Sequence, residues 1–258
     1  MKELITQEPH TPESNAPEPN AHDSKTYVLL HGAWHGAWCW QKVAPVLRAA
    51  GHRVYTPTQT GLGERSHLLS ASVGLETFVQ DLLNVLIWED LDHVILVGHS
   101  FGGLAITAAA DRMPERISHL VYLDALILQN GQSPFSIVPS EVAESRRALA
   151  KLSPGGLTIP VPSADKLGVS DAQDAAWLAA KCTPHPIKTY EDTLALEHDP
   201  GRGLPVTYLA VTPYYAPTQT SREYARSRSD WSYDELPAGH DAMVTSPEAL
   251  SEKLLKIN

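Results

Sequence analysis

Ser100 and the glycines around it form the pattern with the clearest chemical meaning in this sequence. The segment 98-GHSFGG-103 fits G-x-S-x-G, follows an apolar run and precedes an apolar segment with helical spacing. In that context the serine lies in a tight strand-to-helix turn, with its Oγ exposed at the N-terminus of the helix. There the N–H of Phe101 and the helix dipole would favour a developing oxyanion. The pattern predicts a nucleophilic serine, against the alternative of a glycine-rich turn that only packs.

His240 is the best candidate for the base that such a serine needs. It lies in 231-WSYDELPAGHDAMVTSPEAL-250, in a loop of small residues between the last predicted strand and the last predicted helix. Chains with this nucleophile motif place the base last in the sequence. His99, beside the nucleophile, is expected to be a hydrogen-bonded structural histidine. The remaining histidines lie in the N-terminal tail, beside predicted strands or in the interval 126–200, except His67, which lies in the loop after 61-GLGERS-66 and could touch substrate.

The acid that orients the base is less obvious. The residues after the strand predicted at 206–212, 213-PYYAPTQTS-221, contain no carboxylate. Asp124 ends the strand 120-LVYLD-124, and a carboxylate at either of these neighbouring strand ends could reach the same histidine. The order Ser100, Asp124, His240 is therefore the predicted triad, with an Asp that only caps a loop as the alternative. Weaker candidates are Glu223, Asp230 and Asp241.

An alternation of strands and helices must position these residues. Strands are predicted at 26–30, 53–57, 93–98, 117–124, 206–212 and 231–237. Helical patterns occupy 40–50, 75–88, 101–112 and 246–257. Because the early strands are continuous apolar runs, we expect a doubly wound α/β fold with a mostly parallel sheet of about six strands.

The interval from 126 to 200 interrupts this alternation. It contains helical patterns at 139–152 and 171–181 and a Pro/Gly-rich segment at 153–170, but no convincing central strand. We expect it to form a lid with a return helix over the carboxyl ends of the strands, where ligands bind in such sheets. The core would then consist of residues 26–125 and 201–258, preceded by a disordered tail at 1–25.

These motifs resemble the α/β-hydrolase family, over about residues 26–258. The segments that carry the resemblance are 31-HGAWHGAW-38, 98-GHSFGG-103, 122-YLDA-125 and 239-GHDAMVTSPEAL-250. Within this family, the chain resembles plant methyl esterases, hydroxynitrile lyases and related small bacterial esterases. The resemblance implies a serine hydrolase that acts through an acyl-enzyme, but it does not name the substrate.

The tetrapeptide His-Gly-Ala-Trp occurs twice in succession, at 31–34 and 35–38. The resemblance implies that the first copy supplies the second oxyanion donor, the N–H of Ala33, beside that of Phe101. Trp34 would line the acyl pocket. His31 and His35 are four residues apart, but the glycine and the strand end between them, with no third ligand nearby, argue against a metal. The second copy is expected to pack the following helix, and the repetition is interpreted as incidental.

The most favoured function is a carboxylesterase for a small apolar or aromatic ester. Amide or carbamate hydrolysis is an alternative, as are a lyase or a cofactor-free dioxygenase of the same fold and a receptor-like binding protein. The residues at positions 32 and 241, Gly and Asp, differ from the Thr and Lys of the hydroxynitrile lyases, which argues against cyanohydrin cleavage. The pocket is expected to include Trp34, His67, Phe135 and Trp177, with no cofactor and no metal.

Composition excludes several other classes. A net charge of −10 with no basic run argues against nucleic-acid or anionic-membrane partners. No apolar run is long enough to span a bilayer. Two distant cysteines indicate neither a disulfide framework nor a zinc site, so a reducing cytoplasm is expected. The oligomeric state is left open.

Overall fold

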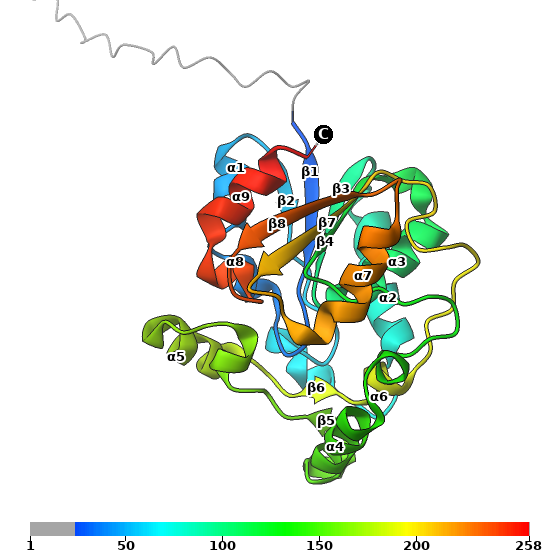
Figure 1. Ribbon diagram of the computed structural model, residues 1–258, viewed down its shortest axis with the longest axis vertical. Helices are drawn as coiled ribbons and strands as arrows, with labels where there is room; N and C mark the ends of the chain where they lie inside the picture. Colours follow the sequence, from blue (N-terminus) through cyan, green and yellow to red (C-terminus); the bar gives the residue numbers. More distant parts are fainter. Residues whose placement is uncertain (1–23, 258) are drawn as a thin grey trace, which may run out of the picture.

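The computed structural model describes residues 24–257, and a six-stranded parallel sheet lies at its centre (Figure 1). Its strands are β1 (Thr26–Leu30), β2 (Arg53–Tyr55), β3 (Val94–His99), β4 (Ile117–Leu123), β7 (Val206–Thr212) and β8 (Ser232–Pro237). Their order is β2-β1-β3-β4-β7-β8, and every neighbouring pair is parallel. The predicted α/β fold class and the number of strands are therefore confirmed. The predicted tail, residues 1–25, lies outside the described residues except for its last two positions.

Helices cover both faces of the sheet. α1 (Ala44–Ala49), α8 (Ala242–Thr245) and α9 (Pro247–Leu255) lie on one side, and α2 (Leu75–Trp88), α3 (Gly102–Arg112) and α7 (Gln219–Ser227) on the other (Figure 1). The helix expected at 40–50 is shorter, because a 3₁₀ turn (Ala37–Trp40) precedes α1 and Pro45 lies in the first turn of α1. β1 and β3 are almost entirely buried, as their apolar runs predict for strands covered on both faces.

Residues 126–200, here called the lid segment, connect β4 to β7. They contain α4 (Ser140–Lys151), α5 (Ala172–Lys181), α6 (Lys188–Glu191) and a small antiparallel sheet of β5 (Thr158–Ile159) and β6 (His185–Pro186). Short 3₁₀ turns lie between them, among them Ala164–Leu167. In Figure 1 these elements lie beyond the arrowheads of β7 and β8, which mark the carboxyl ends of the sheet.

Backbone hydrogen bonds attach the lid segment to the loops at that edge of the sheet. The N–H of Thr183 donates to the carbonyl of Trp34 (2.9 Å), and the N–H of Asp241 donates to the carbonyl of Leu167 (3.1 Å). Gly168 also lies directly against Gly239, where a Cβ would meet the Gly239 Cα at 2.7 Å. Two separate parts of the lid segment therefore touch the loops that carry the predicted site.

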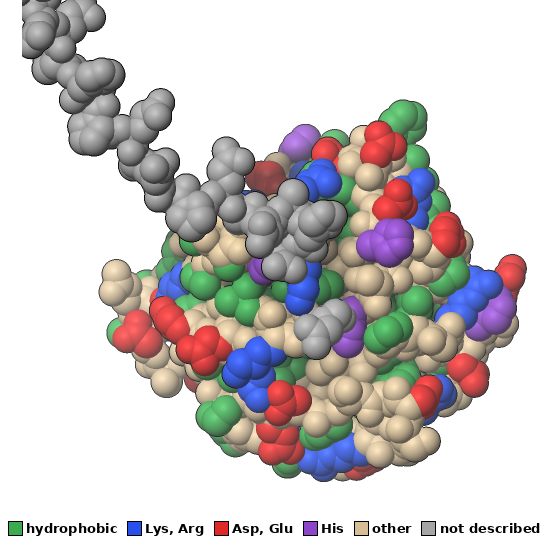
Figure 2. Space-filling view, turned by 90° about the horizontal axis from the view of Figure 1, so that it is seen from above, with side chains coloured by type: hydrophobic (Ala, Val, Ile, Leu, Met, Phe, Trp, Pro, Cys, Tyr) green, Lys and Arg blue, Asp and Glu red, His purple; other side chains and the backbone are tan. Residues whose placement is uncertain are grey.

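The outer surface is mixed in charge. On the face drawn in Figure 2, acidic and basic side chains are interspersed with neutral ones. No helix among residues 24–257 is long and apolar enough to cross a membrane.

Candidate active site

Ser100 occupies the turn between β3 and α3 in a backbone conformation that few residues other than glycine adopt. Its φ is +52°, and its N–H and C=O bond to Leu123 O (3.1 Å) and Leu126 N (2.9 Å) on the neighbouring segment. The glycine at 102 is needed because a Cβ there would meet the His31 carbonyl at 2.7 Å. The strained turn is thus stabilised by the strand beside it and raises Oγ above the sheet edge.

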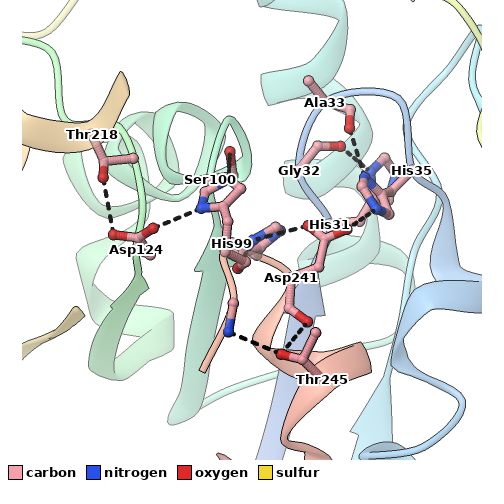
Figure 3. A network of polar contacts seen from close by, with 12 residues as sticks. His31, Gly32, Ala33, His35, His99, Ser100, Asp124, Thr218, Asp241 and Thr245 are labelled. Carbon is pink, nitrogen blue, oxygen red and sulfur yellow. Dashed lines mark hydrogen bonds and ion pairs between the residues drawn. The ribbon is translucent and has the colours of Figure 1, made fainter. Parts of the chain in front are cut away.

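His240 and Asp124 complete a chain of hydrogen bonds to this serine. The Ser100 hydroxyl lies 2.8 Å from His240 Nε2, and His240 Nδ1 lies 2.6 Å from Asp124 Oδ2. The other carboxylate oxygen, Oδ1, accepts a hydrogen bond from the Thr218 hydroxyl (2.9 Å; Figure 3). Asp124 is fully buried and His240 nearly so. Tyr215 stacks on the imidazole, with ring centroids 3.7 Å apart.

The three other carboxylates considered from the sequence have different partners. Glu223 accepts a hydrogen bond from Gln219, and Asp230 is paired at the surface with Arg228. Asp241 is buried and paired with His35. Within residues 24–257, Asp124 is therefore the carboxylate that meets the His240 ring at Nδ1.

The first His-Gly-Ala-Trp copy lies against the nucleophile. A Cβ at position 32 would stand 2.8 Å from Ser100 Cβ and 2.9 Å from His99 Nδ1, so only glycine fits there. Among the backbone hydrogen bonds of turns, loops and caps in residues 24–257, none has the N–H of Ala33 or of Phe101 as its donor. Trp34 has a φ of +66°, and its N–H donates to His185 Nδ1 (3.2 Å).

Three buried histidines around these loops have different charge states. Burial lowers the pKa of His31 to about 3, and it lowers the pKa of His99 well below the ordinary value. Both are therefore neutral at pH 7. The pKa of His35 lies well above the ordinary value, because the attraction of Asp241 outweighs the effect of burial. As expected, His99 has a hydrogen-bonded place: its Nε2–H donates to the His240 carbonyl (2.9 Å).

Sequence reasoning missed the role of His35. Its Nε2 lies 3.0 Å from Asp241 Oδ2, so the second copy of the repeat does more than pack the following helix. The signal available in the sequence was a second histidine in the oxyanion loop together with an aspartate directly after the base. Trp38 of the second copy meets Trp177 of α5 edge-on (5.0 Å).

A cavity of about 600 Å³ opens beside the triad. Tyr215, which stacks on His240, forms part of its wall, together with Trp34, Ile159 and residues 160–163 of the lid segment. Its only charged lining residues are Arg146 and Lys166. A larger cavity of about 870 Å³ lies between α5 and the turn at 164–167. Ser100, His240 and Asp124 line neither cavity, but Tyr215, which stacks on His240, lines the smaller one and not the larger. We therefore regard the smaller cavity as the better candidate for a substrate site.

The other residues expected in the pocket lie elsewhere. Phe135 packs on Tyr190, which in turn contacts Phe101. Trp177 packs on Trp38, and His67 is exposed, with its Nδ1 near the Glu64 carbonyl. None of the three lines the cavity beside His240, so a role in substrate binding stays a prediction for them.

His99, His240 and Asp241 are the one group in residues 24–257 whose nitrogens and oxygens could in principle surround a metal ion, within 4.8 Å of one another. Their ring atoms are engaged in hydrogen bonds, however: His99 Nε2 with a carbonyl, and both nitrogens of His240 with Asp124 and Ser100. These nitrogens are therefore already used in hydrogen bonds within the protein.

Known proteins that resemble this chain in sequence and structure are esterases and alpha/beta hydrolases. The model of the alpha/beta hydrolase family matches residues 27–253. A carbendazim hydrolyzing esterase from Nocardioides is 38% identical over 88% of this chain and 97% of its own length. Methylesterase 2 of Arabidopsis thaliana is 39% identical over 46% of each chain. The solved structure of an extracellular alpha/beta-hydrolase from a Paenibacillus species is 28% identical and superposes with a TM-score of 0.77, over 90% of this chain and 98% of the other.

Proposed function

This chain belongs to the alpha/beta hydrolase family and is a serine hydrolase of the esterase class, and we propose that Ser100, His240 and Asp124 carry out its reaction. The observation that carries this assignment is the continuous hydrogen-bond chain from Ser100 Oγ through both nitrogens of His240 to the buried Asp124 carboxylate. It has the geometry required of a nucleophile, a base and a group that orients the base.

The reaction proceeds in two steps. His240 Nε2 takes the Ser100 proton as Oγ attacks the ester carbonyl, and the buried Asp124 carboxylate stabilises the imidazolium that forms. The imidazolium then gives the proton to the leaving alcohol, which leaves an acyl group on Ser100. Water attacks that acyl-enzyme with His240 again as base, and the free acid and Ser100 are released.

The oxyanion of each tetrahedral intermediate is bound by the N–H groups of Ala33 and Phe101. Phe101 stands at the N-terminus of α3, where the helix dipole adds to the field. The loop that carries Ala33 is in contact with Ser100 through Gly32, which supports this pairing of donors.

The substrate is a small apolar or aromatic ester whose larger part occupies the cavity walled by Trp34, Ile159 and Tyr215. Carbendazim and methyl esters are the first compounds to test, because the relatives are named for them. The lid segment would cover the bound substrate, since it supplies Ile159 and residues 160–163 of that wall. Two free thiols, Cys39 and Cys182, support a reducing cytoplasm as the compartment.

The decisive test compares the wild-type protein with Ser100→Ala. We expect stoichiometric labelling by a fluorophosphonate probe and multiple-turnover hydrolysis of p-nitrophenyl esters, both lost in the variant. A panel of esters, amides and carbamates of varied size would then separate the esterase from the alternative hydrolases. Binding of such compounds without labelling or turnover would instead indicate a receptor-like protein, and the proposal would be abandoned.

A further inference from the structure

His35 connects two loops of the site through its two ring nitrogens. Nδ1 lies 2.7 Å from the carbonyl oxygen of Ala33, and Nε2 lies 3.0 Å from Asp241 Oδ2 (Figure 3). Ala33 belongs to the oxyanion loop, and Asp241 directly follows the base in the chain. Both side chains are almost completely inaccessible to solvent, at 1% and 0% exposure.

The geometry determines the charge of this histidine. A carbonyl oxygen and a carboxylate oxygen only accept hydrogen bonds, so both ring nitrogens must carry protons and His35 is an imidazolium. It forms a buried ion pair with Asp241. The pKa shifts agree, since that of His35 is raised and that of Asp241 is lowered by their mutual attraction.

A second histidine extends the connection to the nucleophile segment. His99, adjacent to Ser100, donates from Nε2 to the His240 carbonyl (2.9 Å), and the same nitrogen lies 3.8 Å from Asp241 Oδ1. The rings of His35 and His99 meet edge-on at 6.2 Å. The oxyanion loop, the nucleophile turn and the base loop therefore converge on one carboxylate, that of Asp241.

We propose that His35 and Asp241 are positioning residues. Together they hold Ala33 and the residue before Asp241, His240, so that the Ala33 N–H and the His240 ring stay correctly placed beside Ser100. Neither side chain contacts the Ser100 hydroxyl, so each acts through the residue it holds. This inference rests on the proposed function, because the groups that the pair positions are catalytic only under that function. Misplacement of a catalytic group by about 1 Å costs on the order of 10²-fold in rate.

The test compares variants of Asp241 that remove the hydrogen bond to His35 with a variant that keeps it. In Asp241→Ala the connection is lost, and we expect kcat per fluorophosphonate-labelled site to fall about 10²-fold with KM changed less than about threefold. In Asp241→Asn the amide can still bond to His35, now neutral, and we expect kcat to stay within about tenfold of wild type. His35→Ala should lose as much as Asp241→Ala.

The double variant His35→Ala/Asp241→Ala tests whether the two residues act as a unit. We expect it to lose no more than either single variant, because the connection is already broken by one change. A matched control is His198→Ala. His198 pairs with the buried Asp111 (2.9 Å), which lies at the end of α3 opposite to Ser100, and its loss should lower stability without changing kcat.

Two results would overturn the proposal while leaving the proposed function intact. One is a folded, fully labelled Asp241→Ala variant whose kcat per site stays within threefold of wild type. The other is equal loss in Asp241→Asn and Asp241→Ala, since a hydrogen-bond tie would then not be the cause. Absence of labelling in the wild-type protein would instead contradict the assignment of Ser100 itself.

Discussion

Asp124→Asn is the substitution that most directly tests the triad. The Thr218 hydroxyl donates to Oδ1 of Asp124, while Oδ2 accepts the proton on His240 Nδ1. In the asparagine variant the amide oxygen would keep the bond to Thr218, so the NH₂ group would face the histidine. Nδ1 must then accept rather than donate, and the remaining ring proton moves to Nε2, toward Ser100. That tautomer cannot take the serine proton.

The expected loss follows from this change of tautomer. Replacement of the triad aspartate by asparagine in serine proteases lowers kcat about 10⁴-fold, which corresponds to about 5.4 kcal/mol of transition-state stabilisation. The fold should persist, because the shape is unchanged and both buried hydrogen bonds are still made. A thermal unfolding curve recorded beside the kinetics would verify that the loss is chemical.

The assay is hydrolysis of a p-nitrophenyl ester, normalised to the amount of folded protein. Asp230→Asn is the matched control, because that aspartate is exposed and paired with Arg228, and its kcat should equal that of wild type. If Asp124→Asn retained kcat within a few-fold of wild type, another carboxylate would orient His240 and the reasoning from Thr218 would be wrong.

Three further predictions concern the surroundings of the triad. Gly32→Ala should lower kcat about 10²-fold, since its Cβ would stand 2.8 Å from Ser100 Cβ. The control Gly131→Ala, where a Cβ meets nothing within 4 Å, should cost only the backbone strain of its positive φ, about 1 kcal/mol in a denaturant titration. Tyr215→Ala should lower kcat/KM about tenfold through the lost stacking on His240, and Tyr215→Phe should not; equal loss in both would point to the hydroxyl. Acid unfolding should protonate three fully buried histidines, because burial lowers their pKa while the unfolded chain protonates them below about pH 6. These are His31, His99 and His185. Their contribution is present above the unfolded pKa and is lost as the pH falls, so the slope of unfolding free energy against pH should be positive between about pH 4 and 6, and a flat profile there would contradict their neutrality.

Local patterns were enough to predict the sheet and the nucleophile turn. The strands around Ser100 are buried on both faces, so their apolar runs appear in the sequence without interruption. The predicted helix at 40–50 was wrong in extent, because Pro45 marks a first helical turn that helical spacing alone does not reveal. The pocket was harder to predict, since Phe135 packs on Tyr190 and Trp177 packs on Trp38, and neither lines the cavity beside His240.

The sequence by itself determined which residues could be nucleophile and base, because a strand–turn–helix motif and a terminal loop are local features. Only the tertiary structure decided which carboxylate meets His240: β4 lies beside β7 in the sheet, and this brings the end of β4 to the place where an acid after β7 would otherwise stand. The same holds for His35 and Asp241, which are 206 positions apart and whose pairing depends on two loops meeting at one sheet edge. Charge states in such a buried cluster follow from contacts and desolvation, which exist only once the chain has folded.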